Sequence, residues 1–123
     1  MKVDEGRQMT LQKCYQKIGN YEEAKNRLFK DERIQKYLQM FLKDLSFSSF
    51  LDAVQNQNYT DAFLHIHTLK GLYLNLSLSH AAEYASLLCE ALRQGEPKED
   101  ISPLIDKLTV RHHEILDAIR ELS

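Results

Sequence analysis

The run His67-Thr68-Leu69-Lys70-Gly71 holds the side chains of this chain that are best suited to chemistry. It lies in a stretch, from residue 60 to about residue 77, whose pattern predicts one long helix. Residues three and four apart share a helix face, so His67, Lys70 and Gly71 should cluster. Neutral imidazole is a nucleophile, an ammonium can offset the charge of phosphoryl oxygens, and glycine lets another backbone come close. The pattern therefore predicts an imidazole that accepts a phosphoryl group from a partner protein.

Apolar residues accompany His67 on the same face of the predicted helix. A helical wheel places Phe63, Leu64 and Leu74 around the histidine, with Asn75 close by. Two interpretations are open: helices from the N-terminal region cover these side chains, or they form an apolar docking patch around the nucleophile. Docking would favour phosphoryl transfer, which depends on close alignment of donor and acceptor. The opposite side of the wheel predicts the core, with Ala62, Ile66, Leu69, Leu72, Tyr73 and Leu76.

Composition limits the classes of function. The chain has 123 residues, so one domain is expected, without room for a nucleotide-binding catalytic domain beside a helical one. A net charge of −2 favours neither a nucleic-acid partner nor an anionic membrane, and no stretch approaches the roughly 20 apolar residues that span a bilayer. Cys14 and Cys89 are compatible with a single disulfide, although a reduced, cytoplasmic setting is the simplest interpretation.

Four glycines and two prolines are few, which favours an all-α chain. A short helix should end at Gly19-Asn20, and a second should cover residues 22–28. Residues 46–49 either continue or kink the longer helix that precedes them. The start signals of the longer helices are Asp31, Thr60, Ser79 and Ser102, the last followed by Pro103. These elements predict an antiparallel four-helix bundle with additional short N-terminal helices.

The motif resembles the histidine-containing phosphotransfer (HPt) domain of bacterial and plant phosphorelays. The family's core pattern is close to His-x-x-Lys-Gly with Thr and Leu in the gaps, and residues 67–71 match it throughout. Asn75-Leu76-Ser77 stands where the family often has Asn-Leu-Gly. Phe41-Leu42 and the run Leu88-Cys89-Glu90-Ala91-Leu92-Arg93 are similar to the family's flanking helices. The likeness covers roughly residues 8–122, which implies a single HPt-like helical domain after a frayed segment, residues 1–7.

The resemblance implies a phosphocarrier. His67 would be the phosphoacceptor, Lys70 would stabilise the phosphoryl group, and Gly71 would allow the partner to approach closely. Phe63, Leu64, Leu74 and Asn75 would dock the partner, which is the receiver domain of a response regulator, a histidine kinase, or both. The receiver would supply Mg²⁺, so no metal or other cofactor is expected on this chain. A cytoplasmic monomer without a kinase or ATP-binding domain of its own is expected.

The chain departs from the family's pattern at two places. Leu72 and Tyr73 follow the glycine where the family often has Ser or Ala, which predicts a bulkier interior. Ser77 replaces a usual glycine, which predicts a helix that runs slightly further. Neither change touches the nucleophile, so the role implied for His67 stands.

Two other classes of function stay open. A helical adaptor would keep the docking patch but carry no phosphate. A metal or small-ligand bundle is a third possibility, although the chain contains no Glu-x-x-His pair of the kind found in di-iron bundles. The sequence has no glycine-rich phosphate loop, so the chain should not bind ATP as a kinase does.

Overall fold

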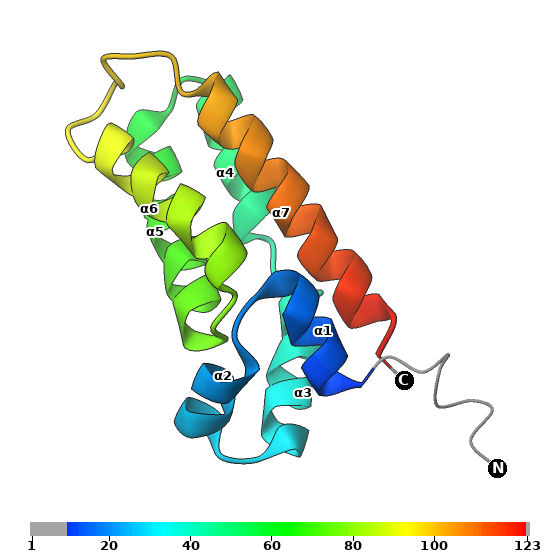
Figure 1. Ribbon diagram of the computed structural model, residues 1–123. Helices are drawn as coiled ribbons and strands as arrows, with labels where there is room; N and C mark the ends of the chain where they lie inside the picture. Colours follow the sequence, from blue (N-terminus) through cyan, green and yellow to red (C-terminus); the bar gives the residue numbers. More distant parts are fainter. Residues whose placement is uncertain (1–9, 123) are drawn as a thin grey trace, which may run out of the picture.

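The computed structural model describes residues 10–122, and helices make up most of this part of the chain (Figure 1). The segment 1–7, predicted to be frayed, lies outside the described residues. No β-strand occurs between residues 10 and 122, so the prediction of an all-α chain is confirmed there. The helices are α1 (Leu11–Ile18), α2 (Tyr21–Leu28), α3 (Asp31–Phe41), α4 (Ser46–Gln55), α5 (Tyr59–Asn75), α6 (Ser79–Leu92) and α7 (Ser102–Arg120).

Side-chain caps explain where several helices begin. The Thr10 side chain accepts a hydrogen bond from the backbone N–H of Lys13 and starts α1. Asn58, and not Thr60 as predicted, starts α5 by accepting from the backbone N–H of Asp61. Asp31, Ser79 and Ser102 are the first residues of their helices instead of the caps that precede them. These differences are shifts of one or two residues, within the usual uncertainty of helix ends.

Residues 46–49 neither continue nor kink the preceding helix, because the helix is interrupted between α3 and α4. The helix that begins at Asp31 ends at Phe41, and a new helix begins at Ser46. The Asp44 carboxylate accepts a hydrogen bond from the Ser46 backbone N–H at 2.8 Å. Because this bond satisfies a donor that an uninterrupted helix would use internally, it favours a new start over continuation.

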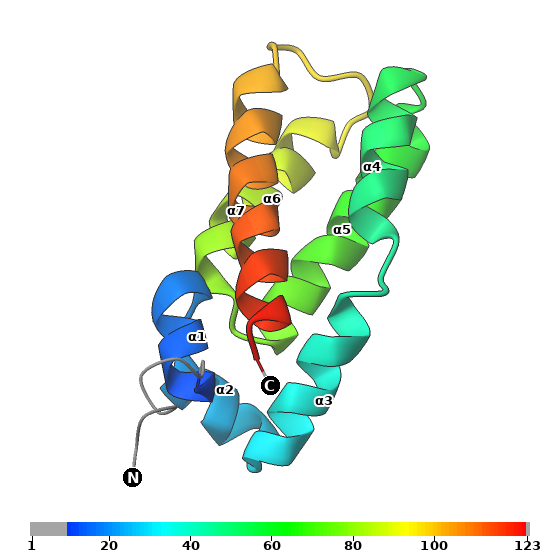
Figure 2. The ribbon, with the colours of Figure 1, turned by 90° about the vertical axis from the view of Figure 1, so that its right-hand side faces the viewer.

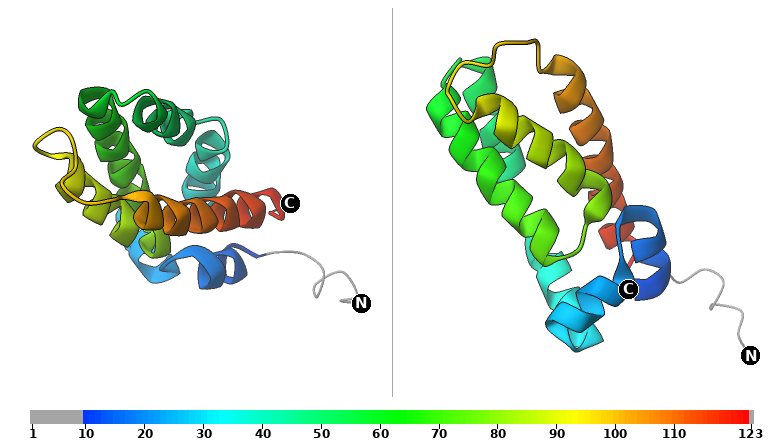
Figure 3. Two further views of the ribbon diagram at one scale, coloured as in Figure 1. Left: turned by 90° about the horizontal axis from the view of Figure 1, so that it is seen from above. Right: turned by 60° about the vertical axis from the view of Figure 1, so that its left-hand side comes forward.

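The helices pack in chain order. α4 lies against α5, α5 against α6, and α6 against α7, while α1 contacts α7 and α2 contacts α3 (Figures 1 and 2). The view from above in Figure 3 shows α4 and α5 on one side and α7 on the other. All seven helices contribute residues to one hydrophobic cluster. No helix within residues 10–122 has both the length and the apolar character needed to cross a bilayer.

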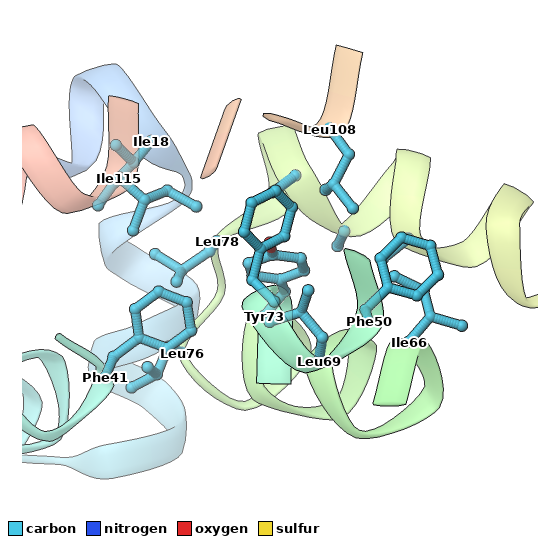
Figure 4. Packing of buried hydrophobic residues seen from close by; sticks show 14 of the residues in the cluster. Ile18, Phe41, Phe50, Ile66, Leu69, Tyr73, Leu76, Leu78, Leu108 and Ile115 are labelled. Carbon is cyan, nitrogen blue, oxygen red and sulfur yellow. The ribbon is translucent and has the colours of Figure 1, made fainter. Parts of the chain in front are cut away.

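The core-facing side of α5 was predicted almost completely. Ile66, Leu69 and Tyr73 are fully buried and lie with Phe50 of α4 and Leu108 of α7 in Figure 4. Ala62 and Leu76 are buried too, whereas Leu72 is half-buried. Burial of this face fixes the rotation of α5 about its axis, and thereby leaves the histidine face outside.

A buried aromatic cluster around His112 connects α7 to three other helices. Its ring stacks on Phe47 of α4 with centroids 4.2 Å apart and lies 5.5 Å from Phe41 of α3. The Tyr73 hydroxyl of α5 is hydrogen-bonded to His112 Nδ1 at 2.8 Å. Burial lowers the pKa of His112 to about 4, with a contribution in the same direction from His113 and an opposing one from Asp44. The cluster thus holds a neutral imidazole at neutral pH.

The turn that ends α5 is fixed by the N-terminal helices. The Asn20 backbone N–H donates to the Ser77 carbonyl at 3.0 Å, and the Tyr15 hydroxyl donates to the Leu76 carbonyl at 2.7 Å. Arg27 donates to the Ser77 hydroxyl at 2.8 Å. Ser77 has a φ of 55°, so it leaves the helical conformation. The prediction of a longer helix at Ser77 is therefore wrong, because the serine adopts the left-handed conformation that glycine would adopt.

Gly19 packs so tightly against this turn that we expect Gly19→Ala to destabilise the fold by about 2–3 kcal/mol. A Cβ on Gly19 would lie 2.0 Å from the Ser77 carbonyl oxygen, which is held by its hydrogen bond to Asn20. Urea unfolding measures the change. Gly71→Ala is the matched control, because its methyl group meets no atom within 4 Å, and it should stabilise the helix by up to about 1 kcal/mol. Equal stability of the two variants would contradict the close packing at Gly19.

Candidate functional site

α5 presents His67, Lys70 and Gly71 on one face, as the motif predicted. The His67 side chain is exposed, and the other two residues are half-buried. Among residues 10–122, no hydrogen bond or ion pair engages the His67 ring or the Lys70 ammonium. Both groups are therefore available to an incoming molecule. Lys70 lies toward α6, where its charge acts on Cys89 and Glu90.

The surface above Gly71 is open. A Cβ built at this position would have no heavy atom within 4 Å, apart from its chain neighbours and the backbone of its own helix. The glycine is thus not required by packing within the described residues, unlike Gly19. A glycine costs about 1 kcal/mol in a helix interior relative to alanine, so its presence here needs another explanation. Close approach of another molecule to the α5 backbone is one.

The Phe63 ring connects His67 to α6. The centroids of the Phe63 and His67 rings are 5.8 Å apart, and the Arg93 guanidinium carbon lies 5.6 Å from the Phe63 centroid. Such a cation over an aromatic face is attractive. Phe63 is half-buried, and its ring is a neighbour of both the imidazole and the guanidinium. The cover on Phe63 therefore includes Arg93, the C-cap residue of α6.

A carboxylate from α6 is paired with Arg93 near the histidine. Glu90 forms a bidentate pair with Arg93, with Nη2 to Oε1 at 2.7 Å and Nε to Oε2 at 3.4 Å. The Arg93 guanidinium lowers the pKa of Glu90, and Lys70 contributes in the same direction. The same two cations oppose the rise that burial causes in the pKa of Cys89. Lys70 and Arg93 therefore both act on one turn of α6, beside the histidine.

Two of the apolar residues predicted to dock a partner are clearly exposed. Leu64 is 57% exposed and Leu74 is 48% exposed, so the N-terminal helices do not cover them and that interpretation is wrong. Asn75 is exposed as well. Leu87 of α6, which sequence reasoning missed, is 48% exposed and lies one turn before Glu90. Leu87 could have been recognised in the sequence as an apolar residue outside the buried stripe of its helix.

A groove between α2, α3 and α5 borders this surface. Its volume is about 530 Å³, and its walls are mainly apolar. Leu72 and Asn75 bring α5 into the groove, while Arg27 closes one end with hydrogen bonds to the carbonyls of Leu74 and Asn75. The remaining lining residues are Leu28, Tyr37, Met40, Phe41, Asp44 and Leu76.

Three further histidines and the two cysteines do not belong to the cluster of His67, Lys70 and Gly71. His80 is exposed at the start of α6, with Nδ1 2.9 Å from the Lys17 carbonyl. His65 is half-buried, and His113 is exposed on α7. Cys14 and Cys89 are both free and buried, so the alternative of a disulfide between them is wrong. Between residues 10 and 122, no three His, Cys, Asp or Glu side chains gather as a metal site would require.

The arrangement can bind an anion at an exposed nucleophile. An imidazole without a hydrogen-bond partner in the described chain lies one helical turn from an ammonium, and a guanidinium is held nearby on Phe63. α5 and α6, which carry these groups, also expose Leu64, Leu74 and Leu87. No family model, no curated protein and no solved structure matches this chain. The geometry of α5 and α6 is thus the basis for assigning a function.

Proposed function

We propose that this chain is a phosphorelay phosphocarrier. His67 reversibly accepts a phosphoryl group from a receiver aspartate or a histidine kinase and passes it to a receiver aspartate. The observation that carries the proposal is the exposed, unbonded His67 ring, placed one turn from Lys70 and beside the open surface at Gly71. Phosphotransfer needs a nucleophile, charge stabilisation and room for a partner, and this face of α5 offers all three.

The transfer step conserves atoms and electrons without any redox change. A lone pair on an imidazole nitrogen attacks phosphorus, a P–N bond forms, and the bond from phosphorus to the aspartyl oxygen breaks. The carboxylate leaves with the electron pair, and the reverse reaction passes the group on. Lys70 offsets charge on the phosphoryl oxygens, which is the main contribution that a protein makes to such a transition state. By the HPt resemblance, the nitrogen is the one distal to the backbone, and the receiver supplies Mg²⁺.

The partner docks on the exposed leucines that surround the histidine. Leu64 and Leu74 extend the surface along α5, and Leu87 extends it onto α6. Asn75 adds a polar contact at the end of α5. Burying these side chains in the complex would exclude water from the reacting atoms and align donor with acceptor.

We also propose that α4, α5, α6 and α7 form the four-helix bundle that the sequence predicted. Consecutive packing of these helices supports this view, as does the stack of Phe47 on His112, which joins α4 to α7. α1 and α2 then brace the end of the bundle at Ser77. In this arrangement α5 is a bundle helix whose outer face carries the nucleophile.

The remaining features of the proposal follow from the chemistry required. The chain acts as an intermediate in transfer and is not itself a kinase. It functions in the cytoplasm as a monomer, since its helices share one core within a single chain. Nucleic acid is not its partner, because its net charge is −2. It holds no metal of its own.

A labelling experiment tests the proposal. Receiver domains from the same source are charged with radiolabelled acetyl phosphate and incubated with the wild-type chain. We expect label on the chain that is labile in acid and stable in base, as phosphohistidine is. Absence of label, or label that survives acid, would overturn the phosphocarrier. Receiver binding without label would instead support the adaptor.

A bulky side chain at Gly71 should block docking without harming the fold. We expect Gly71→Gln to weaken receiver binding at least about tenfold, since the new side chain would project into open surface that the partner occupies. Calorimetric titration of a receiver domain into each variant measures the effect. Val110→Gln, at an exposed site on α7, is the control and should bind normally. Normal affinity of Gly71→Gln would contradict close approach at this position.

A further inference from the structure

One surface carboxylate, Glu90, is paired with a cation, Arg93, that lies over the Phe63 ring next to the histidine. Glu90 is paired with Arg93 through two hydrogen bonds, and neither side chain makes another hydrogen bond within residues 10–122. We propose that Arg93 is a second phosphoryl-binding cation and that Glu90 is the internal counter-ion from which it is released when His67 is phosphorylated. This inference rests on the proposed phosphocarrier function. The exchange of Arg93 from Glu90 to the phosphoryl group sets how strongly the chain holds that group.

The Phe63 ring is a common neighbour of the guanidinium and the histidine. The Arg93 guanidinium carbon lies 5.6 Å from the Phe63 ring centroid. The His67 ring centroid lies 5.8 Å from the same Phe63 centroid. A phosphoryl group on the imidazole would extend outward from α5 into the solvent that Arg93 also faces. The Arg93 side chain is 47% exposed, so rotation about its flexible stem can carry the planar fork from one acceptor to the other.

The exchange is favourable because the existing pair is weak. Exposed ion pairs at this helical spacing contribute little, and the Glu90 side chain is 67% exposed. A phosphoryl group carries more negative charge than a carboxylate and offers three oxygens in a geometry that guanidinium binds with two parallel bonds. Arg93 should therefore leave Glu90 for the phosphoryl group once it arrives.

Glu90 also interacts with Lys70 through charge alone, since no hydrogen bond or ion pair joins the two side chains within residues 10–122. Its carboxylate pKa is lowered first by Arg93 and then by Lys70, so both cations lie within its field. Before phosphorylation the carboxylate neutralises positive charge around the imidazole. After phosphorylation it becomes a like charge next to the phosphoryl oxygens. Removing the Glu90 carboxylate should therefore favour phosphohistidine, and removing the Arg93 guanidinium should disfavour phosphohistidine.

A double-mutant cycle measures the exchange. The wild-type chain, Arg93→Gln, Glu90→Gln and the double variant are each equilibrated with a charged receiver domain, and the phosphoryl partition between the two proteins is quantified. We expect Arg93→Gln to lower the share on His67 about three- to tenfold and Glu90→Gln to raise it by a similar factor. In the Arg93→Gln background, Glu90→Gln should have a clearly smaller effect, because only Lys70 is then released.

The chain provides a matched control on α7. Arg111 and Glu114 form a pair with the same spacing and similar exposure, remote in sequence from the motif. Glu114→Gln changes net charge as Glu90→Gln does, so its phosphoryl partition should equal that of wild type. A second readout, the salt dependence of the partition, should be steeper in wild type than in Arg93→Gln, since a purely structural role would not alter it.

The outcomes separate this inference from the proposed function. Label on wild type with an unchanged partition in Arg93→Gln would overturn the inference alone. Equal effects of Glu90→Gln in both backgrounds would also overturn it, because Glu90 would then act independently of Arg93. Absence of label on every variant, wild type included, would overturn the phosphocarrier itself.

Discussion

The His67→Gln variant will take up no label from a charged receiver domain, and its stability will match that of wild type. Glutamine keeps a polar side chain of similar reach but has no nucleophilic nitrogen, so no P–N bond can form. The His67 side chain is exposed and unbonded within residues 10–122, which makes the substitution harmless to packing. Label incorporation and urea unfolding, measured on the same preparation, check both statements.

A second exposed histidine provides the control for this loss. His80 is on α6, near the Lys17 carbonyl and without an ammonium at the next turn. His80→Gln should therefore accept label as wild type does. Persistent label on His67→Gln would assign the chemistry elsewhere and remove the proposed role. A lost label together with normal receiver binding would place the defect in chemistry and not in docking.

The orientation of the motif could be predicted from sequence because it depends on one helix. The apolar period of α5 determines which side is buried, and Ile66, Leu69 and Tyr73 on that side place His67 opposite. Helical geometry then fixes Lys70 and Gly71 relative to the histidine without any tertiary information. For the same reason, the all-α class followed from the scarcity of helix breakers.

What the sequence did not predict depends on contacts between helices. Arg93 reaches the Phe63 ring from another helix, and no periodic pattern within α5 or α6 indicates that contact. The exposure of Leu87 likewise follows from how α6 is rotated against α5. The left-handed conformation of Ser77 depends on hydrogen bonds from Asn20 and from Arg27 of α2, which lie about fifty residues or more earlier in the chain.

Lowering the pH from 7 to 5 will destabilise the fold by about 2 kcal/mol through His112. His112 is only 6% exposed, and burial lowers its pKa to about 4, whereas an unfolded chain binds the proton near pH 6.5. The unfolded state therefore gains the proton first as the pH falls. The stabilising contribution is fully present above about pH 6.5 and is lost progressively as the pH approaches 4.

Urea unfolding at pH 7, 6 and 5 measures this dependence, and two variants isolate it. His112→Gln should be less stable at pH 7, since it loses the stack on Phe47, but its stability should change much less with pH. His67→Gln removes an exposed histidine and should keep the wild-type slope. An identical slope in all three proteins would contradict a buried neutral His112.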